Sequence, residues 1–264
     1  RITDWILTNC YNTPFHDPRA RGLLFDPRSH EERPMYCHAF AMTYLALIFA
    51  QETDPTRRER IRQALHDAIE VTERSQTSDG GWGYRPNYRE DEGTLVVTQL
   101  QGLRACRDAG IHVPKRIIDR AINYIRNSTN PDGSVRYRVS AHRTNVRSGV
   151  SCAAIVALWQ AGRYDDPLLR LIRGYVESTV LPSSAHQWRR GHHAEYVQYY
   201  LAQSQLMLGG ESWTRYYRVV ADLLLGEQSR DGSWEGRDRG DVFGTTIALL
   251  ILQMPYHRLS VYQR

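Results

Sequence analysis

The chain has 264 residues, of which 41% are hydrophobic, so it is long enough to form one large hydrophobic core. No run of about 18 apolar residues occurs, which excludes a transmembrane helix, and four widely spaced cysteines exclude a dense disulfide framework. The net charge is +5, and nearly all of the basic residues are arginines. Because acids alternate with these arginines and no nucleic-acid-binding motif appears, we expect no nucleic-acid partner.

The chain begins at Arg1 without a methionine. We therefore expect one domain, residues 1–264, cut from a longer product. This start leaves the compartment open between the cytoplasm and export, and the sequence gives no oligomeric state.

Amphipathic and apolar segments alternate along the chain. Amphipathic segments, with apolar residues at i, i+3, i+4, i+7 and i+8, occupy residues 57–74, 115–126, 168–176 and 216–224. Segments that are apolar on nearly every side occupy residues 36–50, 94–106, 150–161, 196–208 and 244–254. Helices that are apolar all round are buried, so the second kind should lie inside the first.

This alternation predicts an all-α fold, an α/α toroid of about five helix pairs, with apolar inner helices and amphipathic outer ones. A further outer helix is expected over residues 2–9, and no strand pattern is sustained anywhere. In such a toroid every inner helix starts at the same end. The loops 82–93, 135–147, 185–195 and 234–241 should therefore surround one mouth.

A short signature, Gln-x-x-x-Gly-x-Trp, recurs along the chain. It runs from Gln76 to Trp82 and from Gln228 to Trp234, and worn copies occupy residues 131–135 and 21–25. The spacing corresponds to one or two units of about 50 residues, the length of a helix-pair repeat. We expect the glycines to adopt a positive φ in a tight turn, and the glutamines and tryptophans to join neighbouring repeats.

These motifs resemble the prenyltransferase and squalene-oxidase repeat of squalene–hopene cyclases and protein prenyltransferase β subunits. Three further stretches, residues 35–41, 98–114 and 250–255, resemble a bacterial cyclase-like branch of that superfamily. The resemblance covers essentially the whole chain. It implies an α/α toroid with an apolar central cavity and an isoprenoid ligand, whereas it is poor evidence for a particular activity because one fold carries many functions.

The acids that the resemblance implies are absent in their usual form. Cyclases of this superfamily protonate their substrate with an Asp-x-Asp-Asp motif, which does not occur here. The nearest acids are Glu90, Asp91 and Glu92, ahead of an inner helix. Burial raises the pKa of a carboxylic acid, and Leu95 and Val96 could desolvate Glu92, our candidate proton donor, with Asp91 beside it. The alternative is a solvated acidic helix N-terminus.

No cofactor is predicted, and zinc is the alternative that one pair of residues suggests. The Asp-x-Cys pair of protein prenyltransferases is absent, but the adjacent Cys37 and His38 resemble the zinc ligands of lanthipeptide cyclases, which are also α/α toroids. Zinc needs three or four ligands, so His38 would have to be joined by His192, His193 or Asp241 across the mouth. His38 is alternatively a catalytic candidate or a hydrogen-bonded core residue.

The predicted mouth is basic and should suit an anionic head group. The candidates for ligand binding are Arg143, Arg147, His193, Tyr196 and Asp241. The loop before His193 contains the further basic residues His186, Arg189, Arg190 and His192. Arginine forks and helix N-termini bind phosphates and carboxylates. An apolar ring with Tyr44, Trp159, Tyr199 and Tyr200 is expected below. The alternative is that these loops are charged simply because they are exposed.

Three functions therefore stay open. The first is an isoprenoid-handling enzyme resembling a terpene cyclase or a prenyltransferase. The second is a non-catalytic toroid that binds a peptide or a lipid. The third is a structural module of a larger protein.

Overall fold

The computed structural model describes residues 1–11, 20–29, 32–86, 88–181, 193–237, 239–257 and 262. Over these residues the ordered elements are helices, and β-type pairing is limited to three isolated bridges. The all-α class predicted from the sequence is confirmed. The chain forms two compact units: residues 1–128 with 137–141 and 160–162, and residues 129–136, 142–159 and 163–264.

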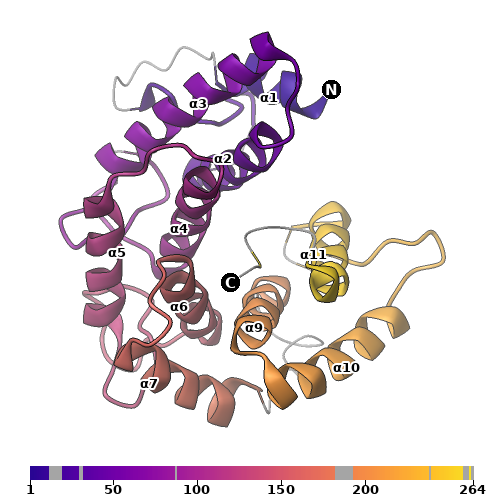
Figure 1. Ribbon diagram of the computed structural model, residues 1–264. Coiled ribbons are helices and arrows are strands. Elements are labelled where there is room, and N and C mark those ends of the chain that lie inside the picture. Colours follow the sequence, from indigo (N-terminus) through magenta and orange to yellow (C-terminus); the bar gives the residue numbers. More distant parts are fainter. Residues whose placement is uncertain are drawn as a thin grey trace. The chain divides into compact units, whose positions relative to one another are not determined.

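The first unit alternates amphipathic and apolar helices as predicted. Its helices are α1 (Ile2–Asn9), α2 (Pro34–Phe49), α3 (Pro55–Arg74), α4 (Gly93–Asp108) and α5 (Lys115–Ser128). The apolar α2 and α4 pack against each other, and α3 packs against both. Figure 1 shows α3 and α5 along one side of the α2–α4 pair. The amphipathic helices thus cover the apolar ones and leave their polar faces to solvent.

The second unit repeats this arrangement. Its helices are α6 (Ser148–Gln160), α7 (Pro167–Tyr175), α9 (Ala194–Leu208), α10 (Gly210–Gly226) and α11 (Asp241–Gln253); α7 continues into the π-helical turn η2 (Val176–Val180), and the 3₁₀ turn η4 (Met254–Tyr256) follows α11. The apolar α9 packs against the amphipathic α10 and the apolar α11 (Figure 1). None of the described helices is long and apolar enough to cross a bilayer.

Two amphipathic helices begin where the sequence signals predict. Asp54 precedes Pro55 and its side chain accepts a hydrogen bond from the Arg57 amide at 2.6 Å. Asp166 precedes Pro167 and accepts from the Leu168 amide at 2.9 Å. A carboxylate at this position satisfies an amide that the helix itself leaves unpaired, and proline fixes the first helical φ.

The two tryptophans of the signature make the same bond in both units. The indole Nε1 of Trp82 donates to the Thr72 carbonyl at 2.7 Å, and that of Trp234 donates to the Leu224 carbonyl at 2.7 Å. Each acceptor lies ten residues earlier, in the last turns of the preceding amphipathic helix. Both side chains are buried. The tryptophan therefore anchors the turn to a helix C-terminus, whose carbonyls lack helical partners.

The glutamine and the glycine of the first signature join the turn to the next amphipathic helix. Gln76 Nε2 donates to the carbonyls of Gly80 and Ile117, both at 2.9 Å. Gly80 has a φ of +94°, and a Cβ atom built there would lie 2.3 Å from the Arg120 carbonyl oxygen. Only glycine both adopts this φ easily and allows α5 so close.

Candidate functional site

The acidic segment that the sequence singles out lies at the start of α4. Glu92 is the N-cap of the helix, and its Oε1 accepts from the Thr94 amide at 3.0 Å. Its Oε2 accepts from the Tyr36 hydroxyl at 2.8 Å and from the Thr94 hydroxyl. Only 2% of Glu92 is exposed. Glu92 is therefore a buried carboxyl group, which corrects the alternative of a solvated helix start for this residue.

Burial decides the protonation of Glu92. Desolvation raises the pKa of its carboxyl group, whereas the hydrogen bonds from Thr94 and Tyr36 act in the opposite direction, and the net shift is upward. A carboxylic acid with a raised pKa holds its proton closer to neutral pH than a surface glutamate does.

Asp91 is the second buried acid. It is 5% exposed, and burial followed by the charge of Asp79 raises its pKa to about 6, against the opposing effect of Arg138. A Cβ atom at Gly81 would lie 2.6 Å from the Tyr124 ring and 3.0 Å from Asp91 Cβ. Glycine at position 81 thus lets Asp91 and the buried Tyr124 pack close to each other.

Three tyrosines from separate parts of the chain form a cluster that contacts Glu92 through the Tyr36 hydroxyl. We call Tyr36, Tyr84 and Tyr137 the tyrosine cluster. The ring centroids of Tyr36 and Tyr84 lie 6.3 Å apart, the hydroxyls of Tyr84 and Tyr137 are hydrogen-bonded, and the Gly93 amide donates to the Tyr137 carbonyl at 2.9 Å. Burial, with the charge of Glu92, raises the pKa of both Tyr36 and Tyr137. Their phenols are therefore protonated at neutral pH.

Two arginines face the rings of this cluster. The guanidinium of Arg33 lies 4.7 Å from the centroid of Tyr84, and that of Arg138 lies 5.6 Å from the centroid of Tyr137. Arg138 also forms an ion pair with the exposed Glu90. A cation within about 6 Å of a ring face is attracted by its π electrons, so these contacts show that the rings can stabilise positive charge.

The tyrosine cluster is not among the residues predicted from the sequence, although the signature carries a signal for it. Tyr84 follows Trp82 by two positions, and Tyr137 follows Val135, which occupies the same place in the worn copy, by two positions. Aligning the copies on their glycines would have placed both tyrosines at one end of the first unit.

His38 is held by hydrogen bonds on both ring nitrogens. Its Nδ1 accepts from the Leu24 amide at 3.1 Å, and its Nε2 lies 3.2 Å from the Ala68 carbonyl and 3.1 Å from the Thr72 hydroxyl. The ring is fully buried, and desolvation lowers its pKa to about 4. This geometry favours the core histidine over the catalytic or metal-binding interpretation.

The neighbouring Cys37 is exposed on α2. Among the described residues there is no group of three or more His, Cys, Asp and Glu side chains that could hold a metal ion. Zinc at Cys37 and His38 stays a prediction, which the zinc content of the purified protein would test.

The ligand-binding candidates of the second unit surround the starts of α6, α9 and α11. Arg143 and Arg147 have exposed side chains, and the Arg143 carbonyl accepts from Asn130 Nδ2 at 2.9 Å. His193 precedes α9 with a left-handed φ of 56°. Tyr196 packs its ring 4.6 Å from that of Tyr200, and Asp241 accepts from the Gly236 amide at 3.2 Å.

A buried acid that the sequence analysis did not single out lies among these starts. Glu195, at the start of α9, accepts from the Arg237 amide at 2.8 Å and is 2% exposed. The basic candidates His186, Arg189, Arg190 and His192 lie outside the described residues.

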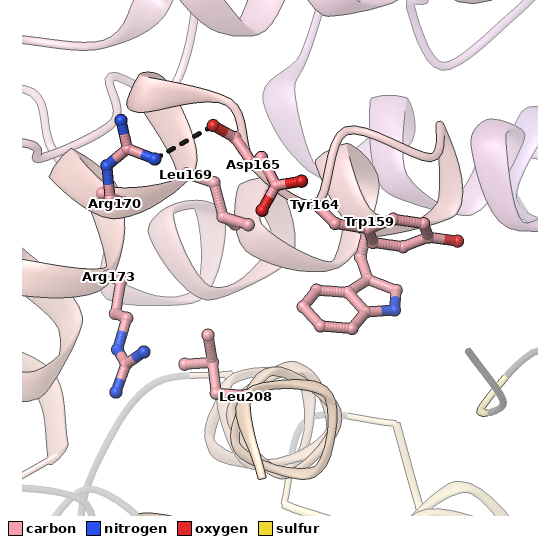
Figure 2. A pocket seen from close by; sticks show the side chains of 7 residues that line it. All are labelled: Trp159, Tyr164, Asp165, Leu169, Arg170, Arg173 and Leu208. Carbon is pink, nitrogen blue, oxygen red and sulfur yellow. Dashed lines mark hydrogen bonds between the residues drawn. The ribbon is translucent and has the colours of Figure 1, made fainter.

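A pocket of about 380 Å³ lies at the other end of α6. Figure 2 shows the side chains that line it, namely Trp159, Tyr164, Asp165, Leu169, Arg170, Arg173 and Leu208. The Trp159 and Tyr164 rings meet edge to face at 4.9 Å. The sequence placed Trp159 below the mouth, but this residue is next to the last residue of α6 rather than near its start. Tyr44 was also expected below the mouth, and its hydroxyl forms a hydrogen bond of 3.1 Å with the Thr3 hydroxyl of α1.

The comparison with solved structures identifies the fold. The chain is similar to the apo structure of the type II terpene cyclase MstE from Scytonema, with a TM-score of 0.55 and 14% sequence identity. The fold is of the terpene-cyclase type. The match covers 85% of this chain and 66% of that cyclase, so this chain spans about two thirds of its neighbour. No protein-family model and no curated protein matches the sequence.

Proposed function

We propose that this protein binds an isoprenoid or a similarly apolar alkene and protonates it, with Glu92 as the acid. One observation carries the proposal: the buried Glu92 carboxyl group meets the Tyr36 hydroxyl at 2.8 Å within a cluster of three tyrosines. The likeness in fold to a type II terpene cyclase supports it, as do the raised pKa values of Glu92 and Asp91.

The chemistry of alkene protonation fits these groups. The carboxyl O–H bond breaks, its proton and the alkene π electrons form a C–H bond, and a carbocation and the Glu92 carboxylate remain. Burial raises the pKa of Glu92 and so favours its protonated form beforehand, and the Thr94 amide and the Tyr36 hydroxyl stabilise the carboxylate afterwards. The tyrosine rings supply π faces for the cation. Asp91, with a pKa of about 6, is the second acid beside it.

Anion binding by the second unit is a separate proposal. The exposed Arg143 and Arg147 can bind a diphosphate or carboxylate in the bidentate way that guanidinium groups favour. Calorimetry with inorganic pyrophosphate tests this. Binding that weakens in Arg143→Ala supports it, and equal binding by both proteins contradicts it.

A second candidate function is a non-catalytic toroid that binds a peptide or a lipid. The observation that favours it is that both oxygens of Glu92 already accept hydrogen bonds, Oε1 from the Thr94 amide as the cap of α4 and Oε2 from the Tyr36 hydroxyl. A carboxylate in this place also stabilises the helix with no chemistry at all.

The two functions predict different behaviour of Glu92→Gln. Glutamine keeps a carbonyl oxygen for the Thr94 amide but has no acidic proton. Squalene and geranylgeranyl diphosphate are incubated with each protein, and products are measured by gas chromatography and mass spectrometry. If Glu92 is the acid, Glu92→Gln should lose at least about 100-fold in rate, the usual contribution of a general acid. Glu90→Gln changes an exposed neighbour and should keep the rate.

Ligand binding is measured in parallel by the shift in melting temperature. Binding without product by the unaltered protein would favour the non-catalytic candidate. If the unaltered protein neither bound these compounds nor formed a product, both functions would be contradicted.

A further inference from the structure

The turn of the last signature, Gln228 to Trp234, has the same backbone as the earlier copies. The φ of Gly232 is +88°, compared with +94° for Gly80 and +87° for Gly133. In each copy the glycine amide donates to the carbonyl three residues earlier, at 2.9 Å for Gly232 and 3.0 Å for the other two. Gly232 therefore lies in a preformed turn.

The earlier copies are covered by an amphipathic helix. A Cβ atom at Gly80 would lie 2.3 Å from the Arg120 carbonyl oxygen of α5, and one at Gly133 would lie 2.3 Å from the Leu171 carbonyl oxygen of α7. In the first case two side chains complete the contact. Gln76 donates to the Ile117 carbonyl at 2.9 Å, and Arg120 donates to the Thr77 carbonyl at 2.5 Å.

The last copy lacks such a cover among the described residues of the second unit. The nearest atom to a Cβ at Gly232 is Gln228 Nε2 at 3.9 Å. Gln228 donates to the Gly232 carbonyl at 3.0 Å, as Gln76 does to Gly80, but within the described part of the chain it has no bond corresponding to the one with Ile117. Residues 228–232 are exposed, whereas Thr77 and Gly80 are buried.

One difference between the copies indicates the chemistry of the missing cover. In the first copy Glu73 forms an ion pair with Arg116 of α5. The corresponding residue, three positions before the glutamine of the last copy, is Leu225, which is 60% exposed. A helix that covers the last copy therefore meets an apolar side chain where α5 meets a carboxylate.

We propose that residues 225–232 form a docking surface for an amphipathic α-helix. We place this helix as α5 lies on the first copy. The helix residue that packs on Leu225 is then apolar, and the main-chain carbonyl of the residue after it accepts a hydrogen bond from Gln228 Nε2. An arginine four residues after the apolar one donates to the Ser229 carbonyl. A main-chain carbonyl of the helix then lies against Gly232, where a side chain would exclude it. The surface continues, in its geometry, the contact already made between repeats.

The test uses the α5 sequence as a probe. A peptide of residues 113–128, with Arg116→Leu to meet Leu225, is acetylated, amidated and labelled with fluorescein, and its binding is followed by anisotropy. The matched protein variants are Gly232→Ala and Gly110→Ala. Both glycines have a positive φ, +88° and +82°, with open space around them. The strain of alanine is therefore similar, but only Gly232→Ala places a methyl group on the docking surface.

We expect the unaltered protein and Gly110→Ala to bind the peptide alike, and Gly232→Ala to bind it at least about tenfold more weakly. The Ile122→Pro peptide cannot form a continuous helix, so this change should abolish binding. A dimer in sedimentation that Gly232→Ala dissociates would also support the surface and would assign the helix to a second copy.

Three results would overturn the proposal. One is equal peptide binding by Gly232→Ala and Gly110→Ala. Another is neither peptide binding nor self-association by the unaltered protein. The last is a melting temperature that falls much further in Gly232→Ala than in Gly110→Ala, because Gly232 would then already be covered in the free protein.

Discussion

At the scale of single residues, the same side-chain type does different work according to its burial. Glu92 and Asp91 are buried and have raised pKa values, whereas the neighbouring Glu90 is exposed and forms an ion pair with Arg138. His38 shows the opposite shift, because burial disfavours the charged form and the charged form of histidine is the protonated one.

His38 should make the protein acid-sensitive. Its pKa is about 4 in the folded protein, against 6.5 for a histidine fully exposed to water, so the unfolded chain binds the proton more readily. The contribution of neutral His38 to the free energy of unfolding is complete above about pH 6.5. It falls by about 3 kcal/mol as the pH decreases to 4. Urea unfolding at pH 7 and pH 4 measures this loss.

The matched variant for this measurement is His38→Gln, which does not titrate in this range. It should lose less free energy of unfolding between the two pH values than the unaltered protein. Equal losses in the two proteins would show that other groups cause the acid sensitivity.

At the scale of the elements, the signature turn connects one helix pair to the next. Trp82 holds the turn on the end of α3, and Gln76 with Gly80 holds α5 against it. The turn therefore acts as a joint between repeats, and its residues are explained without any catalytic role.

The contribution of Trp234 should separate into packing and hydrogen bonding. Trp234→Ala should lower the free energy of unfolding by roughly 3–5 kcal/mol, because a large buried side chain is lost. Trp234→Phe keeps an aromatic ring but loses the bond to the Leu224 carbonyl, itself worth about 1 kcal/mol, and should cost less than alanine. Denaturant titration would refute this role if Trp234→Ala unfolded like the unaltered protein.

The boundaries of α3, α4 and α7 were predictable because their causes are local, whereas α10 begins at Gly210, before the segment 216–224 expected from the sequence. The segment 94–106 corresponds to α4, and the proline-led segments correspond to α3 and α7. Apolar periodicity and caps depend on neighbours within a few residues, so a single sequence contains them. The contact of Tyr36 with Glu92 joins residues 56 positions apart, and no local pattern encodes it.

At the scale of the whole molecule, burial sorts the four thiols. Cys10, Cys106 and Cys152 are buried, and Cys37 is exposed. The folded protein should therefore release one equivalent of thionitrobenzoate rapidly with Ellman's reagent. In guanidinium chloride all four thiols should react. Rapid reaction of more than one thiol in the folded state would contradict the burial of the other three, and Cys37→Ser should remove the fast phase.

The sequence by itself determined the all-helical class, the alternation of apolar and amphipathic helices and the recurring turn, since each depends on spacing within a short stretch. The likeness to a type II terpene cyclase agrees with that class. Only the tertiary structure decided which acids are buried, that both nitrogens of His38 accept or donate hydrogen bonds, and that Tyr36, Tyr84 and Tyr137 form one cluster in contact with Glu92. These properties depend on contacts between distant segments, because desolvation and hydrogen bonding are fixed only when the helices have packed.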